Sequence, residues 1–205
     1  SGGVVSSSGK AVLMPPAWQS RNFLIDLRLL RDSVPSFDEH PFSIPSILAL
    51  DAIVFDRPVT FFVGENGSGK STLLEAIAVG LGLNPEGGSR NFRFSTWREQ
   101  SPLASCLRLA RSPKRIRDYY FLRAESYFNV ATEIEKLDNE PSFGPPIKNS
   151  YGGKSLHSQS HGESFLALFM NRLGGGGLYL FDEPEAALSP SRQMALLARM
   201  HELVQ

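Results

Sequence analysis

Apolar residues recur at every second position near the start of the chain, a pattern that is typical of a β-strand with one buried face. In residues 21–31 these positions are Phe23, Ile25, Leu27 and Leu29. Prolines and short apolar runs follow, and the last run covers residues 59–63. We therefore expect residues 21–63 to form short antiparallel strands, the last of which leads into the next element.

Apolar residues at helical spacing predict several helices farther along the chain. The expected helices lie directly after residue 71 and over residues 103–110, 127–137, 162–173 and 191–204. Unbroken apolar runs predict buried strands at residues 119–122 and 178–181, and the second run is typical of a parallel sheet. Residues 91–96 are also strand-like. Prolines, glycines and serines dominate residues 139–162, so we expect a long mobile loop there with little structure of its own.

A glycine-rich segment joins the apolar run 59–63 to the first of these helices, and it fits the phosphate-loop pattern GxxxxGK[ST]. Glycines allow the backbone to approach phosphate oxygens closely, and the start of the helix favours a negative charge. Lys70 is expected to reach the β- and γ-phosphates of ATP, and Ser71 to bind Mg²⁺. The predicted nucleotide-binding residues are Gly64, Glu65, Asn66, Gly67, Ser68, Gly69, Lys70, Ser71 and Thr72.

The apolar run 178–181 delivers two acidic residues, Asp182 and Glu183, to the carboxyl end of a predicted strand. Ligands of open α/β sheets bind at that edge. Beside a phosphate loop, Asp182 is expected to hold Mg²⁺ and Glu183 to orient and deprotonate the attacking water. The pair would otherwise be two solvated acids at the end of a strand.

The composition is that of an ordinary globular domain. The chain has 205 residues and one cysteine, Cys106, which excludes an internal disulfide and indicates a reducing compartment. No apolar run approaches the length of a membrane span, so we expect a cytoplasmic protein without membrane insertion. The formal net charge is zero, but residues 90–123 contain nine basic and two acidic residues.

The acidic pair belongs to a longer run, Leu178 to Pro190, which resembles the Walker B segment and D-loop of ABC-type ATPases. Upstream, Ser160-His161-Gly162-Glu163-Ser164 resembles the ABC signature Leu-Ser-Gly-Gly-Gln. Gln159 stands in place of its leucine and His161 in place of its first glycine. The sequence looks like small stand-alone bacterial ATPases of the "AAA family" type, and it also resembles the heads of DNA-repair and chromosome-maintenance ATPases.

This resemblance implies an α/β P-loop NTPase fold of the ABC type, with a mainly parallel core sheet, N-terminal antiparallel strands and a small helical lobe. One domain would cover residues 1–205. Its parts would be N-terminal strands (21–63), phosphate loop and helix (64–90), lobe and mobile loop (91–162), and signature helix with Walker B (163–205). A further strand, which carries a switch histidine in this family, is expected after residue 205.

The resemblance also implies an ATP-dependent head-to-tail homodimer that hydrolyses ATP with Mg²⁺. Each ATP would lie between the phosphate loop of one protomer and Ser160, Gly162 and Glu163 of the other, and Ser160 would join Lys70 and Glu183 in catalysis. The same segment also fits a simple helix cap, with Ser160 at the N-cap and Glu163 three residues later. Both interpretations can hold together.

Three further assignments stay open at this stage. The equivalent of the family's glutamine loop is not evident, and Glu125 is the candidate in place of Gln100. The adenine ring could stack on Phe37 or Phe42. The partner could be DNA, for which residues 90–123 supply charge and aromatic rings, or a protein such as a nuclease, toxin or transporter that the ATPase drives.

Overall fold

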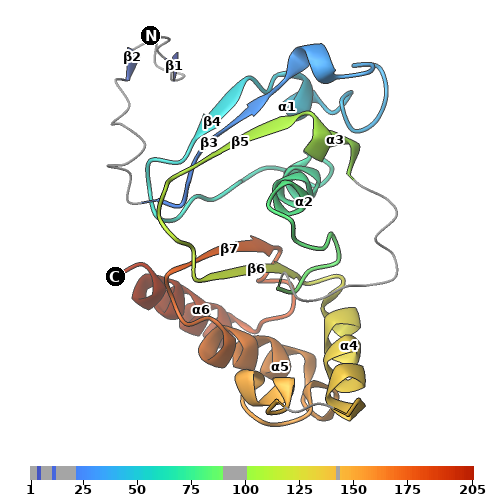
Figure 1. Ribbon diagram of the computed structural model, residues 1–205, viewed down its shortest axis with the longest axis vertical. Coiled ribbons are helices and arrows are strands. Elements are labelled where there is room, and N and C mark those ends of the chain that lie inside the picture. Colours follow the sequence, from blue (N-terminus) through green and yellow to red (C-terminus); the bar gives the residue numbers. More distant parts are fainter. Residues whose placement is uncertain (1–3, 6–10, 13–21, 90–100, 142–143) are drawn as a thin grey trace.

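The computed structural model describes residues 4–5, 11–12, 22–89, 101–141 and 144–205. Two small sheets lie on either side of helix α2 (Lys70–Gly80), and the remaining long helices gather on the far side of the second sheet (Figure 1). The strand predicted at residues 91–96 lies outside the described residues.

The first sheet is antiparallel, and its strands β3 and β4 confirm the antiparallel strands predicted within residues 21–63. Its strand order is β4 (Ala52–Val54), β3 (Leu24–Leu29) and β5 (Leu107–Arg111). Leu27 and Leu29 are buried and belong to the same apolar core as Leu73 and Ile77 of α2. Two further short strands, β1 (Val4–Val5) and β2 (Ala11–Val12), pair with each other near the N-terminus.

The second sheet consists of the parallel strands β6 (Asp118–Arg123) and β7 (Gly177–Asp182). Both were predicted from their unbroken apolar runs. Their register pairs Asp118 with Gly177 at one end and Arg123 with Asp182 at the other. Because the strands are parallel, their carboxyl ends meet at one edge of the sheet, and α2 packs beside that edge (Figure 1).

Helices surround a second apolar core beneath β6 and β7. The longest are α4 (Tyr127–Asn139) and α6 (Pro190–Leu203), and α5 (His161–Ala167) continues into the π-helical turn η5 (Leu168–Arg172). None of the described helices is both long and apolar enough to cross a membrane. The shorter helices are α1 (Pro45–Leu48), α3 (Pro102–Ser105), η2 (Arg31–Ser33), η3 (Ile147–Tyr151) and η4 (Leu156–Ser158).

The prediction of a mainly parallel core sheet is wrong for the described part of the chain, where the parallel sheet has only two strands. Residues 59–63 were expected to form the last of the antiparallel strands, directly before the phosphate loop, but they are irregular, and Phe61 and Val63 are exposed. Apolar and β-branched composition gives a preference for strand, whereas a strand forms only where a neighbouring strand pairs with it. The helix predicted over residues 103–110 is also wrong, because α3 ends at Ser105 and β5 follows.

The prediction of a mobile loop over residues 139–162 is wrong for its described part. Tyr151 and Leu156 are buried in the second core, and the Tyr151 hydroxyl lies 3.4 Å from that of Tyr120 on β6. At its start, the Asp138 carboxylate accepts hydrogen bonds from the backbone N–H groups of Ile147 and Lys148. Two buried side chains and the hydrogen bonds of Asp138 to the start of η3 therefore fix a segment whose composition had suggested a lack of structure.

Candidate functional site

The glycine-rich loop ends at Gly69, which is the N-cap residue of α2 with a φ of 89°. A side chain is disfavoured there by this left-handed backbone and by its neighbours. A Cβ atom would lie 2.9 Å from Ser46 Oγ and 3.0 Å from Ile44 Cγ2. A side chain at this position would therefore be strained, which agrees with the glycine that the motif has here.

The Lys70 side chain folds back over the loop that precedes it. Its ammonium group donates hydrogen bonds to the carbonyls of Gly64, at 2.7 Å, and Glu65, at 2.8 Å. A lysine ammonium has three N–H donors. Within the described part of the chain two of them are used in this way, so one donor remains for a phosphate oxygen.

Ser71 and Asp182 meet although they are 111 residues apart in the chain. The Ser71 hydroxyl, in the first turn of α2, donates a 2.8 Å hydrogen bond to Asp182 Oδ1 at the end of β7, and Asp182 is buried. When phosphate oxygens supply some of its ligands, Mg²⁺ takes only a few oxygen ligands from the protein, such as one hydroxyl and one carboxylate. The described residues contain no group of three or more ionisable ligands that could hold a metal alone. The Ser71 hydroxyl and the Asp182 carboxylate are two oxygen ligands that could hold Mg²⁺ together with the phosphates of a nucleotide.

Glu183 directly follows Asp182 and is exposed. Among the residues that the structure describes, it is the only non-glycine residue with a positive φ, at 50°. A left-handed conformation costs an ordinary L-residue about 1–2 kcal/mol. Such strain is common at functional sites, because the backbone there is set by the direction in which a side chain must point.

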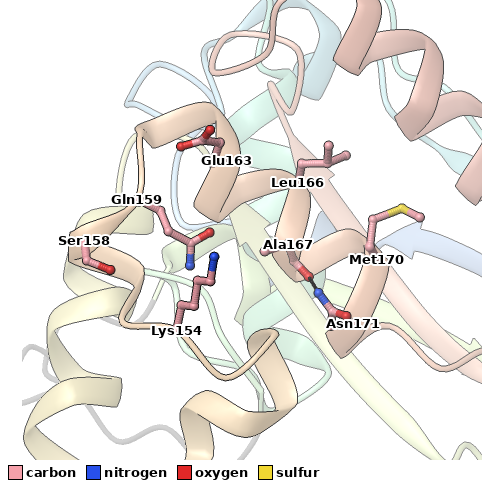
Figure 2. A pocket seen from close by; sticks show the side chains of 8 residues that line it. All are labelled: Lys154, Ser158, Gln159, Glu163, Leu166, Ala167, Met170 and Asn171. Carbon is pink, nitrogen blue, oxygen red and sulfur yellow. Dashed lines mark hydrogen bonds between the residues drawn. The ribbon is translucent and has the colours of Figure 1, made fainter.

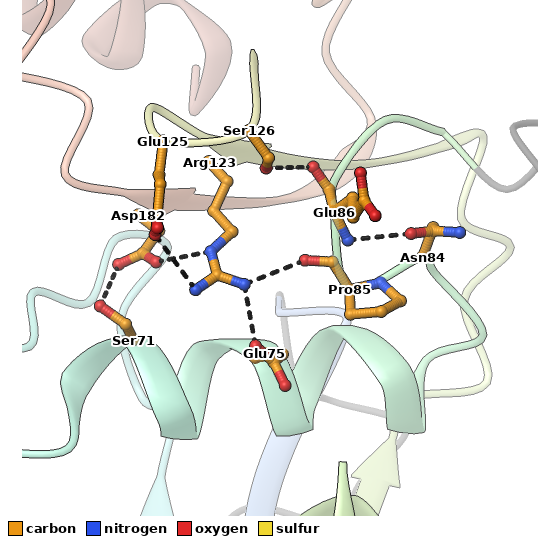
Figure 3. Close-up of polar contacts among 9 residues, drawn as sticks. All are labelled: Ser71, Glu75, Asn84, Pro85, Glu86, Arg123, Glu125, Ser126 and Asp182. Atoms are coloured by element: carbon orange, nitrogen blue, oxygen red, sulfur yellow. Dashed lines mark hydrogen bonds and ion pairs between the residues drawn. The ribbon is translucent and has the colours of Figure 1, made fainter. Parts of the chain in front are cut away.

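Arg123 lies at the end of β6 in the middle of an acidic cluster (Figure 3). Its guanidinium is 2.8 Å from Glu75 Oε2 on α2, 3.4 Å from Asp182 Oδ2 and 3.7 Å from Glu125 Oε2. It also donates a 3.3 Å hydrogen bond to the carbonyl of Pro85. The contact with Asp182 is an ion pair, and the buried Arg123 Nε makes no hydrogen bond within the described part of the chain.

The sequence did not reveal the roles of Arg123 and Glu75. Arg123 was counted with the basic residues 90–123 as a possible DNA contact, and the structure corrects this, because its guanidinium faces three carboxylates. The sequence did offer one signal for Arg123, because it is a single arginine directly after the apolar run 119–122. Glu75 could have been found from its position one helical turn after Ser71.

The segment 160–163 caps helix α5, as the simpler interpretation predicted. The hydroxyl and backbone N–H of Ser160 donate hydrogen bonds to Glu163 Oε2 at 2.8 and 3.0 Å. These bonds lower the pKa of the Glu163 carboxyl. Gly162 lies against α6, where a Cβ atom would be 2.6 Å from Arg192 Nη1 and 2.9 Å from the carbonyl of Ala187.

A hollow of about 620 Å³ lies beside this segment, between residues 154–159 and the helix that starts at His161 (Figure 2). No residue of the phosphate loop and neither Asp182 nor Glu183 lines it, so the hollow is separate from the Ser71–Asp182 pair. Its lining residues are Lys154, Ser158, Gln159, Glu163, Leu166, Ala167, Met170 and Asn171.

The two candidates for adenine stacking have different surroundings. Phe42 is only 3% exposed and is part of the first core, so its ring is closed to a ligand. Phe37 is partly exposed, and the guanidinium of Arg31 lies 4.5 Å from its ring centroid. A cation over one face of a ring is a favourable contact, and Phe37 is the candidate whose ring is only partly buried.

A family model described as an AAA domain matches residues 45–142 of the chain, slightly less than half of its length. The chain is similar to AAA-type ATPases over this part. The match includes the phosphate loop, α2 and Arg123, and it supports ATP binding and ATPase activity. It ends before residues 160–163 and β7. Neither the curated proteins nor the solved structures gave a match.

Proposed function

We propose that this protein binds ATP at residues 64–72 and hydrolyses it to ADP and phosphate with Mg²⁺. The observation that carries the proposal is the 2.8 Å hydrogen bond between Ser71 and Asp182. It joins the end of the phosphate loop to the acidic end of a buried strand. Neither a structural glycine turn nor a solvated acid pair requires that contact.

In this proposal each residue has a distinct role. The loop N–H groups and Lys70 bind the phosphates, Ser71 and Asp182 hold the metal ion, and Glu183 accepts a proton from the attacking water. Bound Mg²⁺ would neutralise charge that develops on the phosphates. The exposure and backbone strain of Glu183 support its role as the residue that faces water.

A head-to-tail dimer is part of the proposal, with Ser160 and Glu163 of one protomer facing the γ-phosphate held by the other. Within the described part of the chain, no hydrogen bond or ion pair joins residues 160–163 to the phosphate loop. Ser160 and Glu163 are both exposed. A site that is assembled from two protomers would use such a separate, accessible segment.

We also propose that the ATPase acts on nucleic acid. Five exposed cations lie along β5 and the connection that leads from it to β6, with no acidic residue among residues 107–117. Cations clustered in one stretch of the chain favour a polyanion through release of counterions. These residues are Arg108, Arg111, Lys114, Arg115 and Arg117; Arg90, Arg93 and Arg98 of the predicted basic segment lie outside the described residues.

Three measurements test the parts separately. Lys70→Ala should abolish ATP binding measured by calorimetry, and normal binding would refute the phosphate-loop assignment.

Ser160→Arg should bind ATP but remain monomeric in analytical ultracentrifugation, and a dimer of normal affinity would refute the shared site.

Failure of duplex and single-stranded DNA to bind at low salt would refute action on nucleic acid and direct attention to a protein partner.

A further inference from the structure

We propose that Arg123 is a positioning residue that fixes the Asp182 carboxylate for metal binding, an inference that rests on the proposed function. Arg123 and Asp182 are register partners at the carboxyl ends of β6 and β7. The arginine does not belong to the phosphate loop, and it acts through Asp182 and through helix α2 (Figure 3).

The two oxygens of the Asp182 carboxylate have different partners. Oδ1 accepts the hydrogen bond from Ser71, and Oδ2 lies 3.4 Å from Arg123 Nε. A carboxylate that is held at both oxygens cannot rotate freely about its Cβ–Cγ bond. Arg123 therefore keeps Oδ1 directed toward Ser71, which is the side on which the metal ion would bind.

Arg123 also holds the helix that carries Ser71. Glu75 lies four residues after Ser71, so both side chains are on the same face of α2. Arg123 Nη1 lies 2.8 Å from Glu75 Oε2 and donates a second hydrogen bond to the carbonyl of Pro85. One guanidinium thus fixes both the orientation of Asp182 and the distance between Asp182 and Ser71.

This role requires the planar fork of arginine. A lysine has the same charge but concentrates it on one ammonium group, and it could not contact Asp182, Glu75 and the Pro85 carbonyl together. The single guanidinium faces three carboxylates, so the cluster keeps a net charge of −2 that suits a divalent cation. Substitution of Arg123 by lysine keeps the net charge of the cluster and removes only the planar arrangement of N–H donors.

The chain offers a matched control in Arg172. It also forms a forked ion pair with an aspartate of β6, at 2.6 and 3.0 Å from Asp118. The two arginine side chains are similarly exposed, at 21% and 20%. Asp118 lies at the opposite end of the β6–β7 pair from Asp182, so Arg172→Lys tests whether any lost arginine fork in this sheet has the same effect.

The experiment measures Mn²⁺ binding by electron paramagnetic resonance in the presence of a non-hydrolysable ATP analogue, with Mn²⁺ as the probe for Mg²⁺. Affinity for the analogue without metal is measured in parallel. Arg123→Lys should lower Mn²⁺ affinity about 10- to 100-fold, the usual effect of losing a residue that orients a metal ligand. Its metal-free analogue affinity should stay unchanged, and Arg172→Lys should alter neither value.

Unchanged Mn²⁺ affinity in Arg123→Lys would overturn the proposal, as would an equal loss in Arg172→Lys or an equal loss of metal-free analogue binding. If Arg123→Lys does not fold, Glu75→Gln decides, because it removes the anchor of Arg123 on α2. Wild-type Mn²⁺ affinity in that variant would also overturn the proposal. A wild-type protein that binds no Mn²⁺ with the analogue would instead refute the proposed function itself.

Discussion

The two ends of the parallel strand pair β6–β7 use the same residue types for different purposes. At the amino-terminal end, Arg172 and Asp118 form a closed pair, and the guanidinium lies 5.3 Å from the centroid of the Tyr120 ring. At the carboxyl end, Arg123 faces Asp182, Glu75 and Glu125 and cannot neutralise them all. A balanced pair stabilises a fold, whereas an acidic excess can bind a cation.

The hydrogen-bond partners of the two aspartates show the same contrast. Both oxygens of Asp118 accept hydrogen bonds from Arg172. Asp182 Oδ1 instead accepts a bond from Ser71 in the phosphate-loop helix. We therefore expect substitutions at the amino-terminal end to lower the free energy of unfolding. Substitutions at the carboxyl end should instead lower metal binding and the rate of ATP hydrolysis.

The largest effect is expected for Glu183→Gln, which keeps the size of the side chain but removes the proton acceptor. Hydrolysis should slow by about 10²–10⁴, the usual contribution of a positioned general base, and ATP binding should persist. The rate of phosphate release at saturating ATP, compared between the wild type and the variant, measures this change. Wild-type turnover in the variant would remove Glu183 from its proposed role.

The next effect concerns Asp182→Asn at the carboxyl end. Nucleotide-dependent Mn²⁺ affinity should fall by about 100-fold or more. Loss of a residue that only orients a metal ligand lowers metal affinity by about 10- to 100-fold, and Asp182 is itself a proposed ligand. The free energy of unfolding should fall by less than in Asp118→Asn, because Arg123 keeps its 2.8 Å contact with Glu75 and its guanidinium is not left without a carboxylate. A large fall in the free energy of unfolding with normal Mn²⁺ binding would show that Asp182 stabilises the fold and does not bind the metal ion.

Asp118→Asn provides the opposite test at the amino-terminal end. It leaves the partly buried Arg172 without its carboxylate, so the free energy of unfolding should fall by about 2–3 kcal/mol. Urea unfolding measures the loss, and ATP turnover is then compared per folded molecule. Reduced turnover of the folded protein would mean that the two ends do not act independently.

The smallest effect is expected from relief of strain at Glu183. Glu183→Gly should raise the free energy of unfolding by about 0.5–1 kcal/mol, since relief of the left-handed strain exceeds the entropy cost of glycine. Glu183→Ala is the control, because it also lacks the carboxylate but keeps the strain. Equal stability of the two variants in urea unfolding would show that the positive φ of 50° carries no cost.

The sequence predicted the parts of this site that depend on local pattern. The phosphate loop, the start of α2 and the acidic end of β7 follow from short motifs with a fixed spacing, and β3, α4 and β6 follow from periodicity. The interpretation of residues 160–163 as a helix cap is also confirmed by the hydrogen bonds of Ser160 with Glu163.

The remaining features depend on contacts between distant segments. The position of Arg123 among carboxylates requires α2, β6 and β7 to be packed together, and no local pattern encodes that packing. Burial of Tyr151 depends on its contact with Tyr120, 31 residues away. Among the residues that the structure describes, no strand pairs with residues 59–63, and composition alone cannot indicate whether a segment finds such a neighbour.

Calorimetric titration of a non-hydrolysable ATP analogue, with and without Mg²⁺, into wild-type protein and Ser71→Ala tests the proposed metal site most directly. We expect Mg²⁺ to strengthen binding to the wild type and this gain to be lost in Ser71→Ala, while metal-free binding is retained. An equal gain in both proteins would contradict the assignment of Ser71 and Asp182 as the metal site.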